Sequence, residues 1–351
     1  MKNKLLNDTI QQLFEGGKGL LAMDESNGTC NARFAAAGIP QSGEMRRKYR
    51  ELIVTTPRLN EAIGGAILFD ETIRQQTKDG MPIVDVLIKA GIIPGIKVDT
   101  GAKAMAGFPN EKMTEGFDGL RERLQEYKTM GVRFAKWRGV ITISNGIPTT
   151  TCITSNVEAL ARYAALCQEA NIVPIVEPEV LMTGNHSLQT CYDITEQVLK
   201  TLFYQLYQYK IDLQGMILKP NMILAGIACA AQHSIEEVAE ATVNCLQSSV
   251  PAAMPAVAFL SGGQSPEDAS AHLNAIHTKY KSQLPWMVSF SFGRAIQQPA
   301  LDMWKGNETN VEEAQKLLYQ RATFNAAAIR GEYSASLERS VAQQSESIHH
   351  F

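Results

Sequence analysis

The chain has 351 residues, of which 45% are hydrophobic and 20% are charged, and its formal net charge is -3. This composition is typical of a globular protein and argues against a dedicated nucleic-acid-binding protein. The apolar runs are too short to span a bilayer, and the N-terminus lacks the apolar core of a signal peptide. We therefore expect no membrane association and a cytoplasmic location.

Short apolar runs alternate with helix-like segments along the whole chain. Eight such runs are predicted as strands: 19–24, 63–69, 92–98, 134–140, 172–179, 215–220, 256–263 and 287–293. Helical patterning between them is clearest at 43–56, 119–130, 156–170, 187–209, 234–247 and 266–280. Eight βα units in this length predict an α/β protein with a single (β/α)8 TIM barrel. A doubly wound sheet is the alternative, although the dinucleotide fingerprint GxGxxG is missing.

No linker or repeat divides the chain, so residues 1–333 are predicted to form one barrel domain. Residues 334–351 have little apolar periodicity, and we expect them to form a flexible C-terminal tail. The six cysteines include no CxxC pair and are interpreted as free, mostly buried thiols. The six histidines show no ligand constellation either, so no metal is predicted.

The polar residues that carry chemistry gather near the predicted strand ends. In a barrel of this kind the active face lies at the carboxyl ends of the strands. The residues concerned are Asp24, Lys97, Lys136, Arg138, Glu177, Glu179, Lys219, Ser261, Gly262, Gly263 and Arg294. Several charges of both signs at one mouth indicate a site rather than a structural need.

Lys219 is the most informative of these residues, because it follows an apolar run and precedes Pro220. A lysine at the end of a buried strand is a candidate Schiff-base nucleophile, since burial or a neighbouring cation favours the neutral amine. A lysine whose charged end reaches solvent is the alternative.

Spacing along two neighbouring strands sharpens this interpretation. Side chains two residues apart share one face of a strand, so Lys136 pairs with Arg138 and Glu177 with Glu179 on the inner face. Such a charge network separates the pKa values needed for acid and base roles, although it can also be purely structural.

Two anion sites are predicted across the mouth. The segment 261–265 (SGGQS) lets backbone N–H groups approach an anion, and 291–294 (SFGR) adds Arg294 one strand later. Lys97, Arg138 and Arg33 are candidates for a second site, with ordinary salt bridging as the alternative. A substrate with a phosphate at each end fits this pattern.

Ordered motifs between about Leu5 and Tyr333 resemble those of class I fructose-bisphosphate aldolases. They are LAMDES (21–26), IGGAILF (63–69), GIKVD (95–99), AKWR (135–138), VEPE (176–179), LKPN (218–221), FLSGGQ (259–264) and SFSFGR (289–294). The resemblance implies a metal-independent Schiff-base aldolase on a (β/α)8 barrel. It also implies a homotetramer that acts on fructose 1,6-bisphosphate without a cofactor.

The resemblance also assigns roles to individual residues. Lys219 is implied as the Schiff-base lysine, Lys136 as the nearby cation, Glu177 as the general acid and base with Glu179 in support, and Asp24 as the carboxylate near the C4 hydroxyl. Arg33, Ser261, Gly262, Gly263, Ser291 and Arg294 are implied around the 1-phosphate, and Lys97 and Arg138 around the 6-phosphate. The chain departs from the family in ending in Phe351 rather than tyrosine, so a phenolic hydroxyl is missing there. His349, His350 or water could replace it, or the tail could be idle.

Other functions stay open at this point. A Schiff-base aldolase for sedoheptulose 1,7-bisphosphate or fructose 1-phosphate would use the same chemistry. A transaldolase-like enzyme is less favoured, because the two predicted anion sites suit a substrate with two phosphates. A metal-dependent aldolase is less favoured, because the histidines of this chain form no metal-ligand cluster. A non-catalytic scaffold is disfavoured by the intact set of Asp24, Lys136, Glu177 and Lys219.

Overall fold

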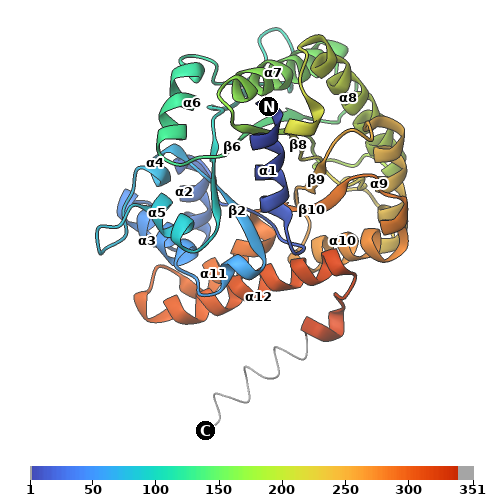
Figure 1. The fold of residues 1–351 in the computed structure, drawn as a ribbon. Coiled ribbons are helices and arrows are strands. Elements are labelled where there is room, and N and C mark those ends of the chain that lie inside the picture. Colours follow the sequence, from blue (N-terminus) through green and yellow to red (C-terminus); the bar gives the residue numbers. More distant parts are fainter. Residues whose placement is uncertain (1, 339–351) are drawn as a thin grey trace.

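In a computed structural model, which describes residues 2–338, eight parallel strands close into a barrel (Figure 1). Around the barrel the order is β1-β10-β9-β8-β7-β6-β3-β2. The strands are β1 (Gly19–Ala22), β2 (Ile63–Leu68), β3 (Ile93–Lys97), β6 (Phe134–Ile141), β7 (Val173–Val180), β8 (Ile217–Leu218), β9 (Ala256–Phe259) and β10 (Met287–Phe292). This closure confirms the predicted fold and rules out the doubly wound sheet, because each strand pairs with two neighbours and no edge remains.

Helices surround the barrel. They are α1 (Lys2–Phe14), α2 (Asn27–Ala36), α3 (Gly43–Val54), α4 (Asp70–Ile73), α5 (Ile83–Lys89), α6 (Leu120–Thr129), α7 (Thr150–Glu169), α8 (Leu188–Gln208), α9 (Ile235–Ser249), α10 (Pro266–Tyr280), α11 (Arg294–Trp304) and α12 (Val311–Arg330). Hydroxyl caps begin many of them; Ser234 and Glu237 form a capping box at the start of α9. The helices predicted from the sequence are all present. The one predicted over 156–170 begins earlier, because Thr149 caps the backbone N–H of Cys152.

Two predicted strands are shorter than expected. The run 215–220 contributes only Ile217–Leu218, since a short 3-10 turn precedes it and Pro220 has no N–H for the ladder. The run 256–263 leaves the sheet after Phe259, and the following residues form a loop. An antiparallel hairpin that the sequence interpretation missed, β4 (Gly101–Ala104) and β5 (Lys112–Glu115), follows β3.

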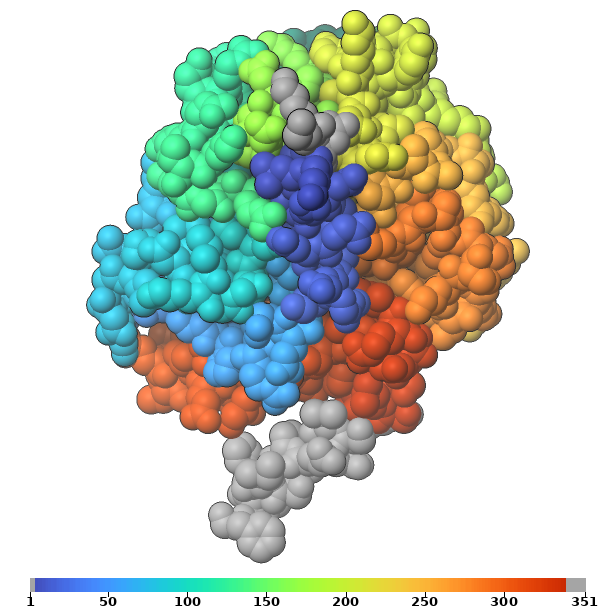
Figure 2. Space-filling model, in the orientation of Figure 1, coloured from blue at the N-terminus to red at the C-terminus, as the bar shows by residue number. Residues whose placement is uncertain are grey.

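The amino ends of the strands are covered by α1, which lies across the barrel end that faces the viewer in Figures 1 and 2. Leu6, Ile10 and Leu13 of this helix join the apolar residues inside the barrel. The helix lies so close to β2 that a Cβ at Gly64 would stand 2.0 Å from the Leu13 carbonyl oxygen. Only glycine fits there, and the opposite end of the barrel is left for a site.

The described chain ends against α12, where the Glu338 carboxylate accepts hydrogen bonds from Arg321 and Tyr333. The rest of the predicted tail, with His349, His350 and Phe351, lies outside the described residues. All six cysteines are free thiols and five of them are buried, as predicted.

Candidate active site

The predicted charged residues lie on the inner face of neighbouring strands. In the parallel pairing of β6 with β7, Arg138 stands opposite Glu177 and Lys136 opposite Ile175. On β6 an apolar residue, Phe134, comes first and the charged residues follow at every second position. The inner face therefore changes from apolar to charged toward the carboxyl ends of the strands.

Four of these side chains form one buried cluster. Lys219 Nζ lies 3.0 Å from Glu177 Oε1, and Lys136 Nζ lies 3.1 Å from Glu177 Oε2 and 2.7 Å from Asp24 Oδ2. All four residues are at most 8% exposed. The cluster thus contains two ammonium groups and two carboxylates, and Glu177 stands between the two lysines.

Electrostatics favours the ionised carboxylates in this cluster. Burial alone would raise the pKa of Asp24, but the charges of Lys136 and Lys219 outweigh it and lower the pKa to about 2. The same balance lowers the pKa of Glu177, where Lys136 has the larger effect. Burial would lower the pKa of Lys136, yet Asp24 and Glu177 raise it above the ordinary value. Lys136 is therefore a permanent cation rather than a proton donor at neutral pH.

A second charge pair lies beside this cluster. Glu179 accepts a hydrogen bond from Arg138 Nε, so the two residues predicted to face inward contact each other. Lys97 donates to Asp99 Oδ1 at 2.5 Å, and Asp99 also accepts from the Arg138 backbone N–H at 3.3 Å. Asp99 was not predicted as a site residue, because its role in orienting Lys97 depends on side-chain geometry.

Arg33 enters from α2 and is held by acidic and amide groups. Its guanidinium forms an ion pair with Glu25 Oε1 at 2.5 Å and a hydrogen bond to Gln298 Oε1 at 3.1 Å. Glu25 also pairs with the buried Arg50 at 2.8 Å. Glu25 is a site residue that the sequence interpretation missed, although it follows Asp24 directly in the LAMDES motif.

The loops after β9 and β10 meet at the same mouth. Arg294 donates to the Gly262 carbonyl at 2.5 Å, which joins the two loops. Ser291 Oγ is buried and, within residues 2–338, has no hydrogen-bond partner. A buried hydroxyl of this kind needs a partner, and a bound anion would supply one.

A cavity of about 1420 Å³ brings the predicted residues together. Every predicted site residue except Gly263 appears in its lining within the described part of the chain. Gly263 instead donates its N–H to Met182 Sδ at 3.1 Å. Lys103 of the hairpin also lines the cavity and was not predicted.

Across residues 2–338 no helix is long and apolar enough to cross a membrane. The same residues hold no group of three or more His, Cys, Asp or Glu side chains suited to a metal ion.

Known proteins resemble this chain over nearly its full length. The family model described as "Fructose-bisphosphate aldolase class-I" matches residues 5–350. A "Probable fructose-bisphosphate aldolase class 1" of Xanthomonas axonopodis pv. citri is 54% identical, covering 95% of this chain and 99% of that protein. "Fructose-bisphosphate aldolase 4, cytosolic" of Arabidopsis thaliana is 46% identical over 95% of this chain and 84% of its own length.

A solved structure agrees with these sequence matches. Fructose-bisphosphate aldolase of Plasmodium falciparum, solved in complex with TRAP and a small-molecule inhibitor, superimposes with a TM-score of 0.92 at 44% identity. The match covers 95% of this chain and 96% of that chain. The resemblance seen in the motifs is thereby confirmed, and this chain belongs to the class I fructose-bisphosphate aldolase family.

Proposed function

We propose that this chain catalyses the reversible aldol cleavage of fructose 1,6-bisphosphate through a Schiff base on Lys219. The products are dihydroxyacetone phosphate and glyceraldehyde 3-phosphate. The observation that carries the proposal is the burial of the Lys219 amine at the cavity floor, 3.0 Å from Glu177 and beside the fixed cation Lys136.

Formation of the Schiff base begins with attack of the Lys219 amine on the C2 ketone. Only the neutral amine attacks, and Glu177 Oε1 lies within reach of the proton that the ammonium must lose. The protonated Glu177 then returns this proton to the C2 hydroxyl of the carbinolamine, and water leaves. This donation leaves Glu177 ionised again, a state that the positive charge of the neighbouring Lys136 favours.

Cleavage uses the iminium as an electron sink. A base removes the proton of the C4 hydroxyl, the C3–C4 bond breaks, and its electron pair moves into the enamine on Lys219. Asp24 is our candidate for the group at the C4 hydroxyl, because it stays ionised and lines the cavity. Glu179, which we propose supports Glu177, accepts a hydrogen bond from Arg138.

The phosphates would orient the sugar in the cavity. We assign the 1-phosphate to Arg33, Ser261, Gly262, Ser291 and Arg294, which line the cavity, and the 6-phosphate to Lys97 and Arg138. Gly263 belongs to the same loop, but its N–H donates to Met182 Sδ. The unpartnered Ser291 Oγ and Arg33 Nε support the first assignment, since both are buried polar atoms without partners within residues 2–338. Binding energy at both ends would hold C2 against Lys219.

Borohydride reduction in the presence of dihydroxyacetone phosphate tests the mechanism. The expected result is a stable adduct that peptide mapping locates on Lys219, absent from the Lys219→Ala variant. Cleavage that is abolished by a chelator, with no adduct on the enzyme, would overturn the proposal.

Substrate choice and assembly complete the proposal. We infer a preference for fructose 1,6-bisphosphate over sedoheptulose 1,7-bisphosphate or fructose 1-phosphate, which competition experiments compared by kcat/KM would check. We further propose a homotetramer, testable by sedimentation velocity, and a cytoplasmic location, supported by the cytosolic Arabidopsis relative.

A further inference from the structure

We propose that Met182 is a positioning residue of the loop formed by residues 261–264, which it holds in place through its sulfur atom. The inference rests on the proposed function, in which this loop binds the 1-phosphate. Met182 lies two residues beyond the end of β7, outside every motif that the sequence singled out. Its sulfur acts on the site through Gly263 of the loop.

The contact is a hydrogen bond from the backbone. Gly263 donates its N–H to Met182 Sδ at 3.1 Å. A thioether is a weak acceptor, but it is the partner of this N–H in the structure. The donor is thereby turned toward Met182, whereas the neighbouring Ser261 and Gly262 belong to the cavity lining.

The two glycines of the loop have different explanations. Gly262 has φ +58°, a left-handed conformation that favours glycine. A Cβ at Gly263 would lie 3.2 Å from Met182 Sδ and 3.3 Å from Ile227 Cδ1, closer than side chains tolerate without a shift. Glycine at 263 thus leaves Met182 and Ile227 in place, and its backbone angle does not call for glycine.

Met182 and Ile227 both pack against Gly263. The Ile227 N–H donates to the Met182 carbonyl at 2.8 Å, so the segments after β7 and β8 meet here. Arg294 donates to the carbonyl of the neighbouring Gly262 at 2.5 Å. The loop therefore contacts a cation, Arg294, and two apolar side chains from the segments that follow β7 and β8.

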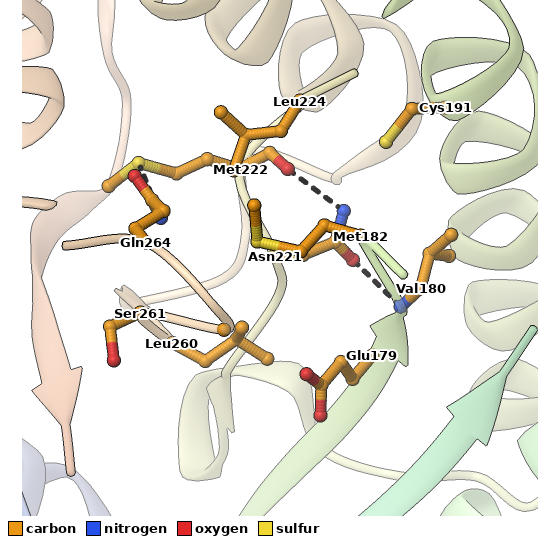
Figure 3. Close-up of a pocket in the computed structure, with 11 residues that line it drawn as sticks. Glu179, Val180, Met182, Cys191, Asn221, Met222, Leu224, Leu260, Ser261 and Gln264 are labelled. Carbon is orange, nitrogen blue, oxygen red and sulfur yellow. Dashed lines mark hydrogen bonds between the residues drawn. The ribbon is translucent and has the colours of Figure 1, made fainter. Parts of the chain in front are cut away.

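The packing behind the loop is incomplete. A small void of about 10 Å³ is lined by Met182, Met222, Leu260, Gln264 and other residues (Figure 3). Gln264 is anchored separately, because His272 Nδ1 lies 2.7 Å from its Oε1. Since a void supplies no contacts to resist movement of Gly262, the bond from the next residue, Gly263, to Met182 restrains this part of the loop.

The test measures the affinity of the enzyme for each of the two products separately. In Met182→Leu the side chain keeps its apolar character and loses its acceptor. We expect KM for fructose 1,6-bisphosphate and the inhibition constant of dihydroxyacetone phosphate to rise about threefold, toward the lower end of the range for one hydrogen bond, because a thioether is a weak acceptor. The inhibition constant of glyceraldehyde 3-phosphate, held by Lys97 and Arg138 in our assignment, should change less than twofold, as should kcat.

Two further variants separate positioning from general damage. Met182→Gln restores an acceptor on a chain of similar length and should recover most of the lost affinity for dihydroxyacetone phosphate. Met130→Leu, at the end of α6 and packed against the core, should leave all constants unchanged.

The outcomes distinguish this inference from the proposed function. If wild-type enzyme forms the Lys219 adduct but Met182→Leu keeps its affinity for dihydroxyacetone phosphate, Met182 does not position the loop. Equal loss of affinity for both products would also overturn the inference, because it would indicate a general structural effect. Absence of the adduct in wild type would instead overturn the proposed function.

Discussion

The two ends of the barrel interior are built from the same strands but differ in chemistry. Toward the amino ends, Phe134, Ile175 and Ile217 pack with α1 in a dry apolar cluster. Two residues further along each strand, the same inner face carries Lys136, Glu177 and Lys219. One backbone scaffold thus supplies stability at one end and reactive charges at the other. The comparison predicts that substitutions at the two ends affect different properties.

The largest effect is expected at Lys219. Lys219→Ala should lower the cleavage rate by more than about 10³-fold, because the covalent route through the iminium is lost. Steady-state kinetics with fructose 1,6-bisphosphate measures the loss, and thermal unfolding should still give one cooperative transition. A rate within tenfold of wild type would remove Lys219 from the mechanism.

The second-largest loss of activity is expected from substitution of Glu177. Glu177→Gln keeps the shape of the side chain but cannot carry a proton, so we expect kcat to fall about 10²-fold to 10⁴-fold, the usual contribution of general acid and base catalysis. Single-turnover trapping of the Schiff base should slow in parallel. Glu169→Gln, in the exposed pair with Arg121, is the control and should retain wild-type rates.

Substitutions at the apolar end should change the free energy of unfolding but not the catalytic rate. Phe134→Ala opens a cavity in the cluster beneath the site and should lower the free energy of unfolding by about 3 to 5 kcal/mol. Urea denaturation measures this change, and kcat of the folded fraction should stay within a fewfold of wild type. The control Tyr207→Ala, at a residue 78% exposed, should change the unfolding free energy by at most about 0.5 kcal/mol. A large fall in kcat of folded Phe134→Ala would contradict the division between the two ends.

The smallest effect is the contribution of Asp24 to pH-dependent stability. Its pKa is lowered from 3.8 to about 2 by folding. The ionised group therefore stabilises the fold fully above the unfolded pKa, and this contribution is lost as pH falls toward the folded pKa. The linked free energy is about 2 kcal/mol.

Denaturation midpoints measured from pH 6 to pH 2.5 check this contribution. Asp24→Asn should lose stability with acid less steeply than wild type, even though it starts from a lower value at pH 6. Parallel curves for the two proteins would show that Asp24 is not the group that titrates.

The fold and the inward-facing residues of two strands could be predicted from the sequence alone. The alternation of apolar runs with helical segments determines the (β/α)8 barrel, since each pattern has a period that local geometry imposes. The period of two along β6 and β7 likewise predicts that Lys136, Arg138, Glu177 and Glu179 face the interior. Strand ends were predicted less well, because Pro220 has no N–H for the ladder and the residues after Phe259 form a loop that the apolar run did not indicate.

Only the tertiary structure decided which charges meet and which groups orient them. Glu177 stands between Lys136 and Lys219 because β6, β7 and β8 are adjacent in the closed barrel, and the distances follow from that pairing. The contacts of Glu25 with Arg33 and of Met182 with Gly263 carry no periodic signal, and Asp99, which contacts Lys97, lies beyond the end of β3. Each of these contacts joins side chains and loops whose relative placement arises from packing, which no local pattern encodes.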